Sequence, residues 1–208
     1  MIKNLLFDLG GVIMDIEKER CVAAFEELGL RDARSYFGDF SQQGPFMRLE
    51  QGTISPDEFH AALRTGLPEG VSDEAIDRAF CKFLIGIPAH RLDELRRLRR
   101  SYRVYMLSNT NPIMWKSKIR DDFGQQGLTR EDYFDGIVTS FEAKALKPDR
   151  AIFDYACRKL GIRPEETLFI DDSQANLDAA AALGFRAALA APHTEFIQVI
   201  TPILEAER

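Results

Sequence analysis

The chain has 208 residues, of which 45% are hydrophobic, and a formal net charge of -6. This length can bury a full core, either as one domain or as one domain that carries an insertion. The acidic net charge gives no basic surface that would attract nucleic acid or anionic lipid. The apolar runs are too short for a signal peptide or a membrane span. We therefore expect no nucleic-acid or membrane partner. With three cysteines that lack metal or redox spacing, these features predict a cytoplasmic protein.

The first predicted strand covers about residues 3–8, where an apolar run ends at Asp8 and turns on glycine. The range 17–28 has apolar residues at helical spacing and stops at Gly29. Glycine at that point is typical of a helix end. A helix is therefore expected directly after the first strand and its turn.

The chain from residue 31 to about residue 88 has no convincing strand pattern. Ser55 precedes a proline and is followed by Glu58, which is the arrangement of a capping box at a helix start. Ser72 has a similar place before a second apolar periodicity. This part of the chain is predicted to be helical.

Beyond residue 88 the periodicity changes to short apolar runs that alternate with helical segments. The runs are RVYMLSN, GIVTS, TLFID and RAALA. Such alternation is expected of a parallel sheet, to which the first strand also belongs. The sequence thus predicts a Rossmann-like open parallel α/β core from residues 1–15 and 88–208, with a small α-helical domain inserted at residues 16–87.

Polar side chains follow several of the predicted strands. They are Asp8 after the first strand, Ser108 and Asn109 after the second, Asp171 and Asp172 after the fourth, and Lys147 at a predicted helix start. Ligands of open parallel sheets bind at these carboxyl ends. Each acid alone would be interpreted as a helix cap. Together, however, the carboxylates repel one another unless a cation lies between them. Ligation by oxygen atoms alone favours Mg²⁺. A lysine and a hydroxyl suit phosphate, so the set predicts phosphoryl transfer.

These residues lie in motifs that resemble those of the haloacid dehalogenase superfamily of aspartyl-phosphate phosphatases. Its first to fourth motifs are similar to FDLGGVI, LSNT, LKPDRAIF and FIDDSQANLDAA, in the same order. The cap segments of the epoxide-hydrolase phosphatase-domain and glucose-1-phosphate phosphatase group are similar to LEQGTISPDEF. The resemblance implies an α/β core with an inserted helical cap.

The resemblance also implies a role for each residue of the site. Asp8 would be the nucleophile and a metal ligand, and Lys147 would temper the charge around it. Ser108, Asn109 and Lys147 would hold the phosphoryl group. Asp172 and the main-chain carbonyl of Gly10 would bind Mg²⁺ with Asp8, and Asp171 would bind it through water or orient the site.

Gly10 departs from the family pattern, because members usually have an aspartate there that protonates the leaving oxygen and later activates water. Such help is typically worth about 10²–10⁴-fold in rate. The loss favours a leaving oxygen that departs readily, as in a sugar 1-phosphate. It also leaves open a catalytically weak or inactive phosphate-binding module. A 2-haloacid dehalogenase is less favoured, because that branch needs no Mg²⁺ and does not keep the acidic pair at 171–172.

We therefore expect a Mg²⁺-dependent phosphatase that acts on a small phosphorylated metabolite through an aspartyl-phosphate intermediate. If the cap selects the substrate, the place to look is the glycine-containing stretch with Phe37, Phe40, Phe46 and Arg48. Aromatic residues in such a stretch more often pack in a core than line a site. The sequence gives no indication of an oligomeric state.

Overall fold

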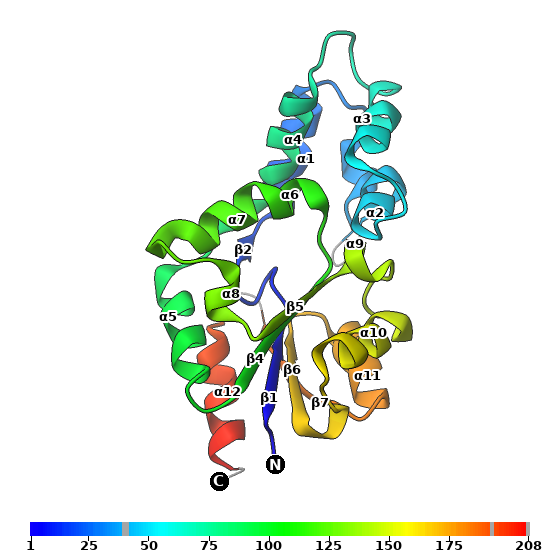
Figure 1. The fold of residues 1–208 in the computed structure, drawn as a ribbon. Coiled ribbons are helices and arrows are strands. Elements are labelled where there is room, and N and C mark those ends of the chain that lie inside the picture. The colour runs from blue at the N-terminus through cyan, green and yellow to red at the C-terminus, as the bar shows by residue number, and fades with distance from the viewer. Residues whose placement is uncertain (39–41, 192–193, 207–208) are drawn as a thin grey trace.

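The computed structural model describes residues 1–38, 42–191 and 194–206, and Phe40 lies outside these ranges. Its centre is a five-stranded sheet with the strand order β5-β4-β1-β6-β7 and parallel pairing throughout (Figure 1). The strands are β1 (Asn4–Phe7), β4 (Arg103–Ser108), β5 (Gly136–Thr139), β6 (Thr167–Asp171) and β7 (Arg186–Leu189). This confirms the predicted open parallel α/β fold and every strand expected in it.

Alternate side chains of the strands enter two apolar layers, one on each face of the sheet. Leu5 and Phe7 of β1 belong to one layer and Leu6 to the other. The first layer is covered by α5 (Ala89–Leu98), α7 (Lys118–Phe123), α8 (Arg130–Tyr133) and α12 (Phe196–Glu205). The second is covered by α10 (Arg150–Leu160) and α11 (Gln174–Ala182). The sheet is therefore buried on both faces, as parallel sheets are.

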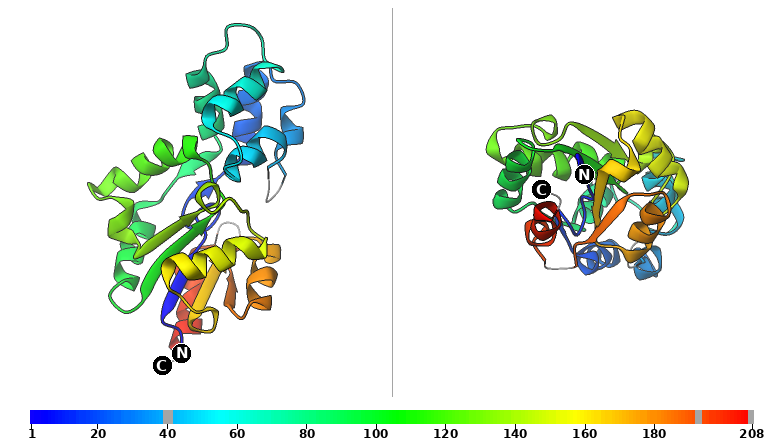
Figure 2. Two further views of the ribbon diagram at one scale, coloured as in Figure 1. Left: turned by 45° about the vertical axis from the view of Figure 1, so that its right-hand side comes forward. Right: turned by 90° about the horizontal axis from the view of Figure 1, so that it is seen from below.

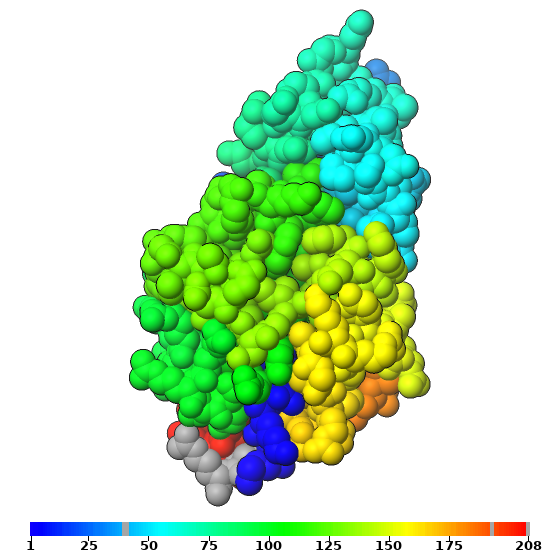
Figure 3. Space-filling view, viewed as in Figure 1, coloured from blue at the N-terminus to red at the C-terminus, as the bar shows by residue number. Residues whose placement is uncertain are grey.

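A group of helices stands beyond the carboxyl ends of the strands and forms the upper lobe of the molecule (Figure 3). It consists of α1 (Lys18–Glu27), the 3₁₀ helix η1 (Ala33–Tyr36), α2 (Gly44–Glu50), α3 (Pro56–Arg64) and α4 (Asp73–Cys81). The predicted capping box is present at α3, where Ser55 and Glu58 accept each other's main-chain N–H. Ser72 caps α4.

Phenylalanine rings fill the interior of this helical lobe. The ring of Phe46 lies 5.1 Å from that of Phe25, 5.0 Å from that of Phe59 and 5.0 Å from that of Phe80, measured between centroids. Their edge-to-face arrangement is favourable for aromatic pairs. These contacts make α1 to α4 one packed unit.

A short antiparallel pair, β2 (Asp15–Ile16) and β3 (Leu84–Gly86), brings the two ends of the helical lobe together. The expectation of no strand between residues 31 and 88 was therefore wrong at β3. A strand of three residues is too short to show a period of two. Helix α2 was also not predicted, because its seven residues carry less than two turns of periodicity.

Short elements complete the chain around the sheet. They are α6 (Pro112–Lys116), η2 (Gly124–Gln126), α9 (Ser140–Ala143) and η3 (Pro164–Glu166). Strand β1 begins and helix α12 ends at the end of the sheet opposite the helical lobe (Figure 2). None of the helices in the described part of the chain combines the length and apolar character needed to cross a membrane.

Candidate active site

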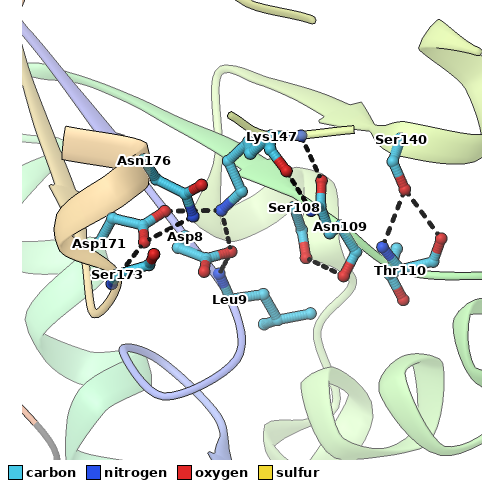
Figure 4. Close-up of polar contacts among 10 residues, drawn as sticks. All are labelled: Asp8, Leu9, Ser108, Asn109, Thr110, Ser140, Lys147, Asp171, Ser173 and Asn176. Atoms are coloured by element: carbon cyan, nitrogen blue, oxygen red, sulfur yellow. Dashed lines mark hydrogen bonds and ion pairs between the residues drawn. The ribbon is translucent and has the colours of Figure 1, made fainter. Parts of the chain in front are cut away.

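The charged centre of the candidate site lies where the neighbouring strands β1 and β6 end (Figure 4). Phe7 and Ile170 are register partners, so the following residues Asp8 and Asp171 come side by side. The Lys147 ammonium lies between them, 2.8 Å from Asp8 Oδ1 and 2.7 Å from Asp171 Oδ2. Its side chain is only 1% exposed, so this is a buried ion triad.

Asp171 is also fixed by the start of α11. Its Oδ1 accepts hydrogen bonds from the Ser173 N–H at 2.8 Å and from Asn176 Nδ2 at 2.9 Å. Both carboxylate oxygens thus have protein partners, because Oδ2 accepts from Lys147. Asp171 is placed to orient the lysine. On Asp8, Oδ1 accepts from the Leu9 N–H at 2.6 Å and from Lys147.

Asp8, Asp171 and Asp172 each offer a carboxylate oxygen, and these oxygens lie within 4.8 Å of one another. Burial raises the pKa of Asp8 to about 8, with Asp171 and Asp172 adding to the rise and Lys147 opposing it. Burial and the nearby Asp171 raise the pKa of Asp172 to about 6. One ammonium therefore does not balance these carboxylates, and the cluster suits a hard divalent cation such as Mg²⁺.

The turn after Asp8 leaves room for Asp172. Gly11 has φ +76, and a Cβ atom there would lie 2.1 Å from Asp172 Oδ2. Only glycine allows this backbone conformation together with this close approach. Gly10 is different, because it has no positive φ, and among the described residues a Cβ atom on it would meet only Ile16, at 3.5 Å.

Asn109 connects β4 to the lysine. Its Nδ2 donates to the Lys147 carbonyl at 3.1 Å, and its Oδ1 accepts from the Lys147 N–H at 2.9 Å. Ser108 is buried beside it and donates to the Asn109 carbonyl at 3.3 Å. The amide of Asn109 therefore holds the backbone from which the lysine side chain extends.

A cavity of about 90 Å³ lies over these groups. On the sheet side it is lined by Asp8, Gly10, Asn109, Lys147 and Asp172, and on the lobe side by Gly38, Gln42 and Glu50. Ser108 lines an adjoining cavity of about 40 Å³ that shares Gly10, Asn109 and Glu50 with it. The structure thus brings together the seven residues that the sequence singled out for catalysis, phosphate binding and metal binding.

Glu50 is a charged pocket residue that sequence reasoning missed. It is 8% exposed, and burial raises the pKa of its carboxyl to about 8, against a hydrogen bond from Gln42 that lowers it. The signal was present, since Glu50 follows Phe46 by one helical turn and so shares its inward face. A single charged residue at the end of an unrecognised helix looks solvated in sequence.

The stretch expected to contact a substrate does line the pocket, but through other residues. Phe46 is 0% exposed and belongs to the core of the helical lobe, while the Arg48 side chain faces solvent. Within the described residues, this stretch contributes Gly38, Gln42 and Glu50 to the pocket. Phe46 therefore packs in a core, as aromatic residues in such a stretch more often do, because helix α2 turns this ring inward.

Comparisons with known proteins agree on one family. The model of the haloacid dehalogenase-like hydrolases matches residues 2–184. The D-ribitol-5-phosphate phosphatase of Bacteroides thetaiotaomicron is 36% identical over 206 residues, which are 99% of this chain and 100% of that protein.

Two solved structures have the same fold over nearly the whole chain. One is a wild-type haloacid dehalogenase (HAD) family enzyme from Bacteroides thetaiotaomicron in complex with magnesium and inorganic phosphate. It is 39% identical to this chain with a TM-score of 0.89, and the match covers 95% of this chain and 98% of that one. A predicted HAD-like family hydrolase from Porphyromonas gingivalis is 33% identical with a TM-score of 0.91, covering 98% of each chain.

Proposed function

The chain belongs to the haloacid dehalogenase-like hydrolases, and we propose that it is a Mg²⁺-dependent phosphatase of a small phosphorylated metabolite. The observation that carries the proposal is the buried Lys147 ammonium between Asp8 and Asp171. Carboxylate oxygens of Asp8, Asp171 and Asp172 also lie within 4.8 Å of one another, close enough to share one metal ion. A cation and an ammonium at one carboxylate fit the transfer of a phosphoryl group to that carboxylate. The relative that hydrolyses a phosphate ester and the neighbour that holds magnesium and phosphate support it.

In this proposal Asp8 is the nucleophile. Its carboxylate attacks phosphorus, the bond from phosphorus to the leaving oxygen breaks, and an aspartyl phosphate forms. Water then attacks phosphorus, which releases phosphate and restores Asp8. Asp8, Asp172 and the Gly10 carbonyl would hold Mg²⁺, with Asp171 beside them, and the bound ion would offset charge on the phosphoryl oxygens. Ser108, Asn109 and Lys147 would bind those oxygens.

The helical lobe would act as the cap of this site, with residues 16–87 inserted into a core of residues 1–15 and 88–208. The pairing of β2 with β3 at the two ends of the lobe supports this division. So does the packing of phenylalanine rings from α1 to α4 against one another within the lobe. Gly38, Gln42 and Glu50 would then cover the phosphorylated group and exclude water from it.

The substrate is proposed to be a phosphorylated sugar or sugar alcohol. The relative named for D-ribitol 5-phosphate favours a sugar-alcohol phosphate. A sugar 1-phosphate is the second candidate, because Gly10 offers no acid and an anomeric oxygen departs more readily than an ordinary alkoxide. Both classes belong in one substrate panel.

The test is a panel of sugar and sugar-alcohol phosphates, assayed with Mg²⁺ and with EDTA, using the wild type and Asp8→Asn. Turnover should require Mg²⁺ and be lost in Asp8→Asn, whereas Asp178→Asn, an exposed acid on α11, should behave as wild type. Metal-independent turnover, or an active Asp8→Asn protein, would overturn the proposal. Tight phosphate binding without turnover of any ester would instead support a binding module.

A further inference from the structure

Glu50 lines the pocket, and the catalytic roles above leave its carboxyl group unused. We propose that Glu50 donates the proton to the leaving oxygen and afterwards takes a proton from the attacking water, replacing the acid that Gly10 cannot supply. The inference rests on the proposed phosphatase function. It makes a primary-alcohol phosphate, whose leaving oxygen needs a proton, a competent substrate.

The position of Glu50 fits a donor to the leaving group. Asp8 reaches the pocket from the sheet edge, while Glu50 reaches it from the end of α2 in the lobe beyond the strands (Figure 1). In a displacement at phosphorus, the leaving oxygen lies in line with the attacking oxygen and on the far side of phosphorus. A group entering from the lobe is on that side when Asp8 attacks from the sheet.

The end of α2 is fixed to the core, so Glu50 has a defined place. Ser140 Oγ lies 2.6 Å from the Glu50 carbonyl oxygen. It also lies 3.0 Å from the Thr110 carbonyl oxygen and accepts from the Thr110 N–H at 3.0 Å (Figure 4). Gly52 has φ +67, and a Cβ atom there would lie 2.2 Å from the Phe141 carbonyl oxygen. Glycine at this position lets the chain pack directly against α9.

The surroundings of Glu50 keep its proton available near neutral pH. Burial raises its pKa to about 8, and Gln42 is its hydrogen-bond partner from the same lobe. From the sheet edge, Asp8, Asp172 and Lys147 line the same pocket. A general acid works best when its pKa lies near the working pH, which holds for this carboxyl group.

The proton balance of the two steps then closes. As the bond from phosphorus to the leaving oxygen breaks, that oxygen takes the Glu50 proton and departs as a neutral alcohol, leaving a carboxylate. In the second step this carboxylate takes a proton from water while the water oxygen bonds to phosphorus. The bond from phosphorus to Asp8 breaks, and both side chains return to their starting states.

The test compares Glu50→Gln with wild type on two esters. One is the primary-alcohol phosphate that wild type cleaves fastest in the panel, and the other is 4-nitrophenyl phosphate, whose leaving group departs without a proton. Turnover of the first should fall by about 10²–10⁴-fold. The second should show a burst of about one nitrophenolate per enzyme followed by slow turnover, because the aspartyl phosphate accumulates without its base.

Glu69→Gln is the matched control, since Glu69 is an exposed acid of the same lobe. In the Glu50→Gln protein, Gly10→Asp should raise turnover at least tenfold, and a Cβ atom at Gly10 would make ordinary contacts with Ile16 among the described residues. Unchanged alkyl-phosphate turnover in Glu50→Gln, an equal loss on both esters without a burst, or no rescue would each overturn the role of Glu50. Absence of Mg²⁺-dependent turnover in wild type would instead overturn the phosphatase function.

Discussion

The two sides of the pocket are held in place by different forces. On the sheet side, Asp8, Lys147 and Asp171 are buried charges that hold one another through short ion pairs. On the lobe side, Glu50 has no ion pair among the described residues, and α2 is held by the apolar packing of Phe46 and by the contact of Ser140 with the Glu50 carbonyl. Ion pairs therefore hold the residues on the sheet side of the pocket in place, and apolar packing holds those on the lobe side.

This difference predicts which substitutions affect chemistry and which affect folding. A buried charge that loses its partner is destabilising and also changes the reactivity of the group left behind. A ring removed from an apolar core leaves a cavity but does not alter a charge elsewhere. Changes on the sheet side should thus move stability and catalysis together, and changes in the lobe core should move stability alone.

The largest effect is expected for Lys147→Met, which leaves Asp8 and Asp171 without their shared cation. We expect a loss of about 3–5 kcal/mol in the free energy of unfolding and no detectable turnover. Urea unfolding and the Mg²⁺-dependent assay measure both. Lys159→Met is the control, because Lys159 pairs with Glu142 at the surface and such pairs contribute about 0–1 kcal/mol. Equal stability losses in the two variants would contradict the comparison.

Phe46→Ala tests the opposite wall. This fully buried ring contacts Phe25, Phe59 and Phe80, so its removal should cost about 3–5 kcal/mol by urea unfolding. At a temperature low enough to keep the Phe46→Ala protein folded, the ratio of its turnover rates on two substrates should equal the ratio measured for wild type. Phe46→Leu should cost less, because it leaves a smaller cavity. A changed ratio in the folded protein would show that Phe46 reaches the substrate after all.

The same contrast explains what the sequence could predict. The acids, Ser108 and Asn109 of the sheet side were visible because they follow apolar strands, and the carboxyl ends of parallel strands meet at one edge. Lys147 was visible at a predicted helix start. Helix α2 and strand β3 were not visible, because seven and three residues carry too little periodicity. The spacing of Glu50 from Phe46 became informative only once α2 was recognised as a helix with Phe46 packed inward. The pocket is thus predictable on one side and depends on the fold for the other.

A smaller effect is expected in the pH dependence of stability. Burial raises the pKa of Glu50 from 4.5 to about 8, so the folded protein holds this proton more tightly than the unfolded chain does. The stabilisation is complete below pH 4.5 and is lost as the pH rises to about 8. Between about pH 5 and about pH 9, without metal, wild type should therefore lose a few kcal/mol more than Glu50→Gln.

Comparing these two proteins removes the contributions of Asp8 and Asp172, whose pKa values are also raised and which both proteins share. The measurement is urea unfolding at several pH values in the presence of EDTA. Glu69→Gln should follow wild type at every pH, since Glu69 is exposed. Parallel curves for wild type and Glu50→Gln would mean that Glu50 is ionised in the folded protein and has no proton to donate.

The smallest effect is expected for Ser140→Ala, which removes the link between the two walls. The hydroxyl is buried between the Glu50 and Thr110 carbonyls, and its loss leaves the Thr110 N–H without this acceptor. We expect a cost of about 1–2 kcal/mol in urea unfolding, because a buried polar group loses its partner. Turnover of the primary-alcohol phosphate should fall several-fold, because its leaving oxygen needs the proton of a correctly placed Glu50. The release of nitrophenolate in the first turnover should change little, because nitrophenolate departs without a proton. Ser101→Ala, at an exposed serine, should leave all three quantities unchanged. If Ser140→Ala slowed both esters equally, the hydroxyl would support the sheet edge at Thr110 and would not be what positions Glu50.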